Sequence, residues 1–346
     1  LMLQVWKSFY ARSDPAKAYS LLSPALILVT LAMLIPLGLM LSFSFFTQVS
    51  FTEIDYSFTV QRYIDFFQKN LLVSLLIKSV KISFIVTFVT LLTAYPVCYY
   101  IAFYVKKNKM LWLVLLTLPF WTSYLLRVFS WKIILGTKGV INSSLINAGL
   151  LSEPLTFLMY SETAVIITLT HAWAAFALLP LYVSLDKIDF SLIEAARDLG
   201  LSRLETFWKI TLPLSLPGII GAILIIFIPT VGDYVTPALL GGTDGRMLSN
   251  MIQAYFGKAN NIPLGAASAT IMLTTVAIIT IIVSNPDLAF HGQNSCLSNQ
   301  TRQNSCFNSL VVPFPFSFLL LMCMCDHTYF SRWLTVIPVE IWSTPL

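Results

Sequence analysis

The sequence predicts an all-α polytopic membrane protein with six spanning helices. Its residues are 57% hydrophobic and only 11% charged, whereas about a quarter of the residues of a soluble domain are charged. Lipid must therefore surround most of the folded chain. A spanning helix needs about 20 mostly apolar residues, and six stretches meet this requirement: 21–46, 75–103, 110–135, 161–185, 214–235 and 265–284. A polar segment, 186–213, separates the fourth and fifth of them.

The distribution of basic residues predicts which ends of the spans face the cytoplasm. Lysine and arginine accumulate in the cytoplasmic loops of membrane proteins. Here they occur before the first span, between the second and third spans, and in the segment 186–213. We therefore expect residues 1–20 to form a cytoplasmic N-terminal segment on the same side as 186–213. The first apolar run is too long for the core of a cleavable signal peptide, so we expect it to remain as an anchor.

Composition and motifs give no support to catalysis, metal binding or nucleic-acid binding. The formal net charge of +5 is explained by basic residues on the cytoplasmic side. The five cysteines lack zinc-finger spacing, and we expect neither a metal site nor a disulfide framework. No serine-hydrolase elbow, His-Glu-x-x-His motif or phosphate-binding Gly-x-x-x-x-Gly-Lys-Ser/Thr loop occurs. We therefore name no catalytic residue and no cofactor, and the chain cannot hydrolyse ATP unaided.

The polar segment 186–213 is expected to form two short helices joined by a turn. Ser191 precedes Glu194 by three residues, and Ser202 precedes Glu205 by three, which is the spacing of a capping box. Gly200 lies where the first helix must end, because glycine adopts the left-handed conformation at no steric cost.

The first of these helices is expected to carry a small apolar face. Leu192, Ala195, Ala196 and Leu199 recur at helical spacing, and the charged residues 197 and 198 face away from them. Such a face could lie in a groove of another protein. An ordinary solvated loop with moderate helix propensity is the alternative.

Four prolines lie within the predicted spans: Pro96, Pro119, Pro180 and Pro229. Each removes one backbone hydrogen bond, and the freed carbonyl must find another partner in the membrane. The prolines are consistent with simple kinks that aid packing. Together they are also consistent with a bundle that contains a polar path.

Asp233 is the most informative ionisable residue, because it lies at or just inside the outer end of the fifth span. A carboxylate at the centre of a span costs about 2.5–3.5 kcal/mol on insertion scales, so such a group usually faces a cavity or a cation. Asp233 could bind an ammonium group of a passing solute. It could equally be an interfacial residue that water solvates at the helix end.

Aromatic residues of the spans could offer ring faces to a cation, or they could be packing and interface residues. They are Trp121, Tyr124, Trp131, Trp173 and Tyr234. Arg127 would repel a polycation, so we interpret it as a paired structural charge. His171 has no ligand-type partner four residues away and is interpreted as a hydrogen-bonded core histidine.

The segment 186–213 resembles the EAA loop of the membrane subunits of bacterial ABC importers, with which five features are in register. In that family the loop forms the helix that docks on a separate ATPase. The corresponding residues here are Glu194, Ala195, Ala196, Asp198, Gly200, Leu201, Ile210, Leu212 and Pro213. The resemblance implies a type I permease core in the bacterial cytoplasmic membrane, with ATP and magnesium bound by the partner.

Over residues 21–284, the sequence is similar to permeases of spermidine/putrescine importers. The segments that carry this similarity are 118–123, 138–142, 194–200, 231–234 and 240–242. The resemblance implies a second homologous permease, two copies of an ATPase and an external polyamine-binding protein. The expected substrate pathway includes Asp233, Tyr234, Trp121 and Tyr124.

Permeases for ferric iron, thiamine or phosphonates stay as alternatives, and a proton-driven secondary carrier is a third class. Residues 285–346 are expected to be an anomalous tail outside the permease domain 21–284. The sequence Gln-Asn-Ser-Cys occurs there twice, at 293–296 and 303–306, and the apolar run 310–325 contains two prolines. We prefer a frameshifted or read-through end to an extra interfacial segment.

Overall fold

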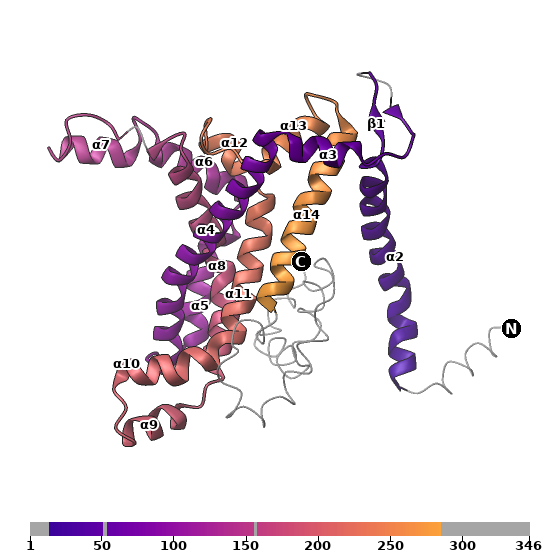
Figure 1. The fold of residues 1–346 in the computed structure, drawn as a ribbon. Helices are drawn as coiled ribbons and strands as arrows, with labels where there is room; N and C mark the ends of the chain where they lie inside the picture. The colour runs from indigo at the N-terminus through magenta and orange to yellow at the C-terminus, as the bar shows by residue number, and fades with distance from the viewer. Residues whose placement is uncertain (1–13, 51–53, 156–157, 285–346) are drawn as a thin grey trace, which may run out of the picture. The chain divides into compact units, whose positions relative to one another are not determined.

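The computed structural model describes residues 14–50, 54–155 and 158–284 (Figure 1). The anomalous tail lies outside the described residues, as do the first 13 residues of the expected N-terminal segment. The chain divides into two units, of which the second, 38–285, holds most of the helices. The described part of the first unit belongs to the helix α2 (Asp14–Phe43), which includes Pro24 and Pro36.

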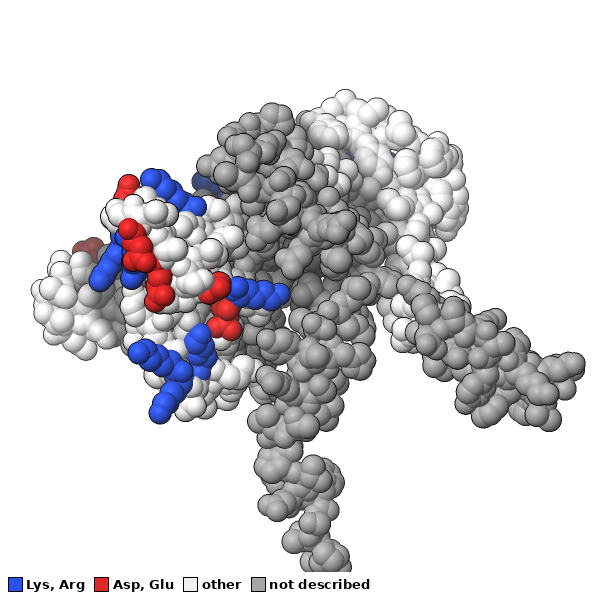
Figure 2. All heavy atoms as spheres, turned by 90° about the horizontal axis from the view of Figure 1, so that it is seen from below, with Lys and Arg blue, Asp and Glu red and all other residues white. Residues whose placement is uncertain are grey.

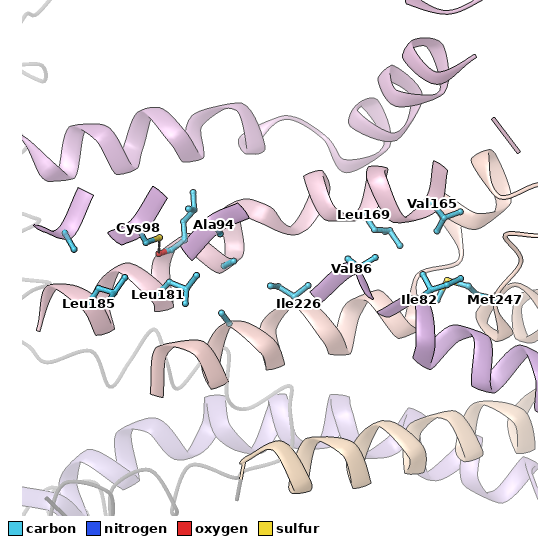
Figure 3. Packing of buried hydrophobic residues seen from close by; sticks show 14 residues of the cluster. Ile82, Val86, Ala94, Cys98, Val165, Leu169, Leu181, Leu185, Ile226 and Met247 are labelled. Atoms are coloured by element: carbon cyan, nitrogen blue, oxygen red, sulfur yellow. Dashed lines mark hydrogen bonds between the residues drawn. The ribbon is translucent and has the colours of Figure 1, made fainter. Parts of the chain in front are cut away.

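Three long helices form the centre of the second unit: α4 (Asn70–Phe103), α8 (Glu162–Asp186) and α11 (Leu212–Gly232) (Figure 1). Their core is apolar, and the side chains of Val86, Leu169 and Ile226, one from each helix, are fully buried in it (Figure 3). Outward-facing residues of the same helices, such as Phe88, are exposed. An apolar outer surface is what a lipid environment requires.

Hydroxyl side chains line the buried face of α4 without leaving an unsatisfied group. Ser79, Ser83, Thr87 and Thr90 are all buried, and each donates to the backbone carbonyl four residues earlier at 2.7–2.9 Å. Small residues at a helix interface allow two backbones to approach closely in a membrane. These hydroxyls therefore contribute to close packing of the central helices.

The third predicted span, 110–135, is present as a bent span rather than as one straight helix. It consists of α5 (Lys109–Thr117), the 3₁₀ turn η1 (Leu118–Trp121) and α6 (Tyr124–Leu135), and the chain bends by 80° between η1 and α6. Pro119 cannot donate a backbone hydrogen bond, and Thr122 adopts an extended conformation. The described residues thus contain five helices able to span a membrane, or six if this bent pair is one span.

Short elements cover the two ends of the bundle. One end, here named the α13 end, carries α3 (Gln61–Gln68), α12 (Val235–Leu240) and α13 (Leu248–Phe256) (Figure 1). The helix α14 (Ile262–Ser284) packs on α3 and α13. The helix α7 (Val140–Asn147) packs on α6, and a two-residue antiparallel pair, β1 (Thr47–Gln48) with β2 (Ile54–Asp55), contacts α14.

The opposite end, here named the α9 end, carries the loop 186–213. This loop contains α9 (Phe190–Asp198), α10 (Arg203–Thr206) and the π-helical turn η3 (Phe207–Thr211), which continues into α11 (Figure 1). The two predicted short helices are therefore present, although the second is only one turn long.

Gly218 sets the distance between α8 and α11. A Cβ atom at this position would lie 2.6 Å from the carbonyl oxygen of Pro180 and closer still to the side chain of Ser184. At Gly221, one turn later on α11, a Cβ would lie 3.6 Å from Pro180, which is an ordinary contact.

We therefore predict that Gly218→Ala destabilises the folded protein by about 1–3 kcal/mol, the usual cost of overpacking a close-packed interface. Gly221→Ala is the matched control and should change stability by less than about 1 kcal/mol. Thermal unfolding of the purified variants in detergent measures both. Equal midpoints for the two variants would contradict the assigned helix contact.

Candidate functional site

The loop 186–213 is ordered by local hydrogen bonds at each helix end. At the start of α9, the carboxylate of Asp189 accepts the backbone N–H of Ser191 at 3.0 Å. This hydrogen bond favours the charged form and lowers the pKa of Asp189 below its usual range. The predicted capping box of Ser191 and Glu194 was wrong, because Asp189 occupies the cap and the helix begins two residues earlier than that box requires.

Gly200 ends α9 as predicted. Its φ is +86°, in the left-handed region. The N–H of Gly200 donates to the carbonyl of Arg197 at 2.9 Å, and the N–H of Leu201 donates to the carbonyl of Ala196 at 3.1 Å. This pair of bonds is a Schellman motif, which satisfies the last carbonyls of the helix and reverses the chain.

The predicted capping box at the start of α10 is confirmed. The N–H of Glu205 donates to Ser202 Oγ at 3.3 Å, and the N–H of Ser202 donates to Glu205 Oε2 at 2.9 Å. The backbone hydrogen bond from Ser202, with a smaller effect of the Lys209 ammonium, holds the pKa of Glu205 below its ordinary value. The carboxylate is therefore charged, and the cap complete, at neutral pH.

The faces of α9 differ from the predicted pattern at one position. Ile193 and Ala196 are buried against the rest of the protein, so Ala196 does not belong to an outward apolar face. Leu192, Ala195 and Leu199 are exposed, and Leu199 is 85% exposed. One face of α9 packs on its own protein, so only the opposite face, with Leu192, Ala195 and Leu199, is free to contact another protein.

Acidic and basic side chains both lie on the surface of the α9 end (Figure 2). Figure 2 views the α9 end and shows both signs of charge on a largely uncharged background. Glu194 and Asp198 are exposed on α9. Their charges are therefore available to an approaching macromolecule.

The remaining motif residues connect the loop to the bundle. Ile210 lies in the π turn η3, Leu212 and Pro213 begin α11, and Leu201 is half-buried after the Schellman turn. The ring of Phe207 in η3 packs edge-on against two tyrosine rings of α4, each with a centroid distance of 5.9 Å. No sequence pattern predicted the π turn, because five residues of helix-forming sequence fit α and π geometry alike.

A cavity of about 290 Å³ lies between α6, α8 and α11. It is named here the Asp233 cavity, and its lining is Tyr124, Arg127, Ala172, Trp173, Phe176, Pro229 and Asp233. Two helix interruptions meet there. Tyr124 is the first residue of α6 after the 80° bend, and Asp233 is the cap residue between α11 and α12. Transporters commonly build solute sites where spanning helices are broken.

Asp233 is half-buried and held by three hydrogen bonds. Its Oδ2 accepts the hydroxyl of Tyr124 at 2.5 Å, and its Oδ1 accepts the backbone N–H of Val235 at 3.0 Å. Its carbonyl accepts the hydroxyl of Ser249 at 2.6 Å. The carboxylate thus lies on the wall of a cavity, where it also accepts the first backbone N–H of α12.

The four expected pathway residues are only partly brought together. Tyr124 and Asp233 are in contact, whereas Trp121 is 81% exposed and Tyr234 is 44% exposed, and neither lines the Asp233 cavity. Trp173 does line it, as does Phe176, which the sequence analysis missed. Phe176 could have been predicted as a cavity residue, because it lies three residues after Trp173 and therefore on the same face of the helix.

Arg127 is not the paired structural charge that we expected. Within the described ranges it forms no ion pair with a carboxylate; its Nη1 donates to the carbonyl of Ala172 at 3.0 Å. The guanidinium also lies over the ring of Phe120, 5.4 Å from its centroid. His171 is exposed rather than buried in the core, and it packs against Phe120 and Trp131.

The chain is similar in sequence to one protein family and to several known permeases. Residues 26–285 match the family described as the binding-protein-dependent transport system inner membrane component. The spermidine/putrescine transport system permease protein PotB of Haemophilus influenzae is 37% identical over 250 residues, which cover 72% of this chain and 86% of that protein. PotB of Escherichia coli is 34% identical over 255 residues, covering 74% of this chain and 92% of that protein.

A solved structure has the same fold. It is that of a bacterial ABC transporter involved in the import of the acidic polysaccharide alginate, with a TM-score of 0.59 and 18% identity; the alignment covers 84% of this chain and 100% of that chain. The family match over most of the chain, the identity to the PotB proteins and this common fold agree. The chain therefore belongs to the inner membrane components of binding-protein-dependent transport systems and is a permease subunit of an ABC importer.

Proposed function

We propose that this permease forms half of a translocation pathway for polyamines. The observation that carries the proposal is the carboxylate of Asp233 on the wall of a cavity with aromatic sides. The names of the PotB relatives support it, because they specify spermidine and putrescine. The alternative of a proton-driven carrier is replaced by membership of the ABC importer family.

The chemistry of the Asp233 cavity suits a slender organic cation. A carboxylate binds an ammonium through charge and hydrogen bonds, and the ring faces of Tyr124, Trp173 and Phe176 attract a cation through their π electrons. The cavity volume of about 290 Å³ lies at the lower end of the range for small-molecule sites, which begins near ~300 Å³. This size fits one end of an aliphatic amine rather than a bulky solute.

The loop 186–213 is proposed to dock on the ATPase subunit. The exposed side chains of Leu192 and Leu199 can enter a groove of the partner, while Ile193 and Ala196 hold α9 to the permease. ATP and magnesium would bind to the partner, since the sequence has no phosphate-binding loop of its own. Rotation of α9 would then pass through η3 into α11 as a rigid-body movement.

This arrangement implies an orientation and an assembly. The α9 end would face the cytoplasm together with the N-terminal segment, which agrees with the basic residues there. The α13 end would receive solute from an external binding protein. A second homologous permease would complete the pathway, and two ATPase subunits would drive it.

Asp233→Asn tests the proposed substrate contact. Asparagine keeps the size of the side chain and an oxygen for the N–H of Val235, but it removes the charge. We expect uptake of putrescine and spermidine to fall at least about tenfold, since charge-assisted hydrogen bonds are the stronger class. Radiolabelled uptake into proteoliposomes that contain the complete importer is the measurement.

Asp244→Asn is the matched control for Asp233→Asn, because Asp244 is an exposed carboxylate that does not line the cavity. It should transport at the normal rate. Normal uptake by Asp233→Asn would remove Asp233 from the substrate pathway. Failure of the unaltered importer to take up either polyamine would refute the proposed function itself.

Gly200→Ala and Glu194→Ala test the proposed coupling contact. Alanine at the left-handed position 200 costs roughly 1–2 kcal/mol and should displace α9, although open space surrounds Gly200. Both variants should insert into the membrane and yet import less solute per ATP hydrolysed. Gly200→Asn is the control, because asparagine tolerates this backbone conformation. Normal coupling ratios in both alanine variants would exclude the docking role.

A further inference from the structure

Arg127 places a positive charge on the wall of the Asp233 cavity. In the described part of the chain, no carboxylate lies within ion-pair distance of it, and the guanidinium is held by the Ala172 carbonyl and the Phe120 ring. A permease for cations would gain substrate affinity by losing this charge. Its presence in the cavity therefore needs a functional explanation.

Two side chains of opposite charge, Arg127 and Asp233, line the cavity. Tyr124 and Arg127 are three residues apart on α6, and side chains at this spacing lie on one face, about 5–6 Å apart at Cβ. The hydroxyl of Tyr124 reaches Asp233. The formal charges of Arg127 and Asp233 cancel over the cavity, although the two side chains do not form an ion pair.

We propose that Arg127 is a specificity-determining residue that limits the Asp233 cavity to one ammonium group at a time. This inference rests on the proposed polyamine function and describes how the same site handles a polycation. One ammonium binds beside Asp233, and the second ammonium of the same molecule is repelled by Arg127. The polyamine therefore enters end-on and keeps its remaining charges outside the cavity.

Admitting only one ammonium group to the cavity benefits transport for an electrostatic reason. Two carboxylates, or one carboxylate without a nearby cation, would hold a diamine strongly in a site of low dielectric constant. A pathway must bind its solute well enough to admit it and weakly enough to release it. Arg127 lowers the affinity of the cavity for a diamine and thereby keeps the release of the diamine fast.

Arg127→Gln tests the inference. The probes are radiolabelled putrescine, which has two ammonium groups, and butylamine, which has one. Equilibrium binding is measured on the detergent-solubilised complex of this chain, the second permease and the ATPase, without the binding protein. We expect the putrescine affinity to rise about tenfold, the effect of removing one nearby like charge, and the butylamine affinity to rise much less.

Transport by the complete importer supplies the second readout. Tighter retention by Arg127→Gln should lower the maximal uptake rate at saturating binding protein, whereas Arg127→Lys, which keeps the charge, should restore both affinity and rate. Lys132→Gln is the matched control. It removes a positive charge from the same helix, at a residue that does not line the cavity, and should change neither quantity.

Three results would overturn the inference. They are an unchanged putrescine affinity in Arg127→Gln, an equal gain for both amines, or loss of the second permease from the purified complex. The last result would identify Arg127 as one side of an ion pair between subunits. In each case, normal putrescine uptake by the unaltered importer would leave the proposed polyamine function intact.

Discussion

Satisfaction of backbone hydrogen bonds is the constraint on which this structure depends. Inside a bilayer, an N–H or carbonyl group without a partner costs several kcal/mol, because no water can replace the missing bond. The central helices meet the constraint internally except at the carbonyls that Pro96, Pro180, Pro217 and Pro229 leave without their helical partner. Where α11 stops at Gly232, the groups of the interrupted chain are taken up by side chains: Asp233 accepts the N–H of Val235, and Ser249 and Asn250 donate to the carbonyls of residues 233 and 234.

This constraint connects the fold to the function. A break in a spanning helix requires polar side chains to repair it, and the same side chains make a polar surface within an apolar bundle. Asp233 serves both purposes, since one oxygen accepts the first N–H of α12 and the other accepts the hydroxyl of Tyr124 at the cavity. The hydrogen bond from the backbone N–H of Val235 thus helps to fix the position of the carboxylate, and each of its oxygens keeps capacity to accept a further hydrogen bond.

The loop 186–213 is ordered in a different way, because its hydrogen bonds are made between residues that are close in sequence. The Asp189 cap, the Schellman turn at Gly200 and the Ser202–Glu205 capping box together span 17 residues of sequence, 189–205. Each satisfies the orphan groups of a short helix in water. Such a loop keeps its shape as one piece, as the proposed docking on an ATPase subunit would require.

Local features of this protein were readable from sequence because their causes are local. The number and approximate bounds of the spans follow from the length of the apolar runs. The turn at Gly200 could be predicted because the end of a helix often requires a positive φ, which glycine adopts without strain. The Ser202 cap follows from the three-residue spacing between Ser202 and Glu205. Where two local signals competed, as Asp189 and Ser191 did, sequence spacing alone chose wrongly.

Tertiary structure decided everything that depends on residues distant in sequence. The 80° bend after η1 moves Tyr124 against Asp233, 109 residues later, and no periodicity predicts that meeting. Burial of Ala196 was determined by the bundle beneath α9 rather than by the helix itself. Arg127 looked like half of an ion pair, but its partners are a carbonyl and a ring, because the fold brings α8 rather than an acid to its side. Sequence determined the membrane class and the shape of the loop; only packing of distant helices determined which side chains share a cavity.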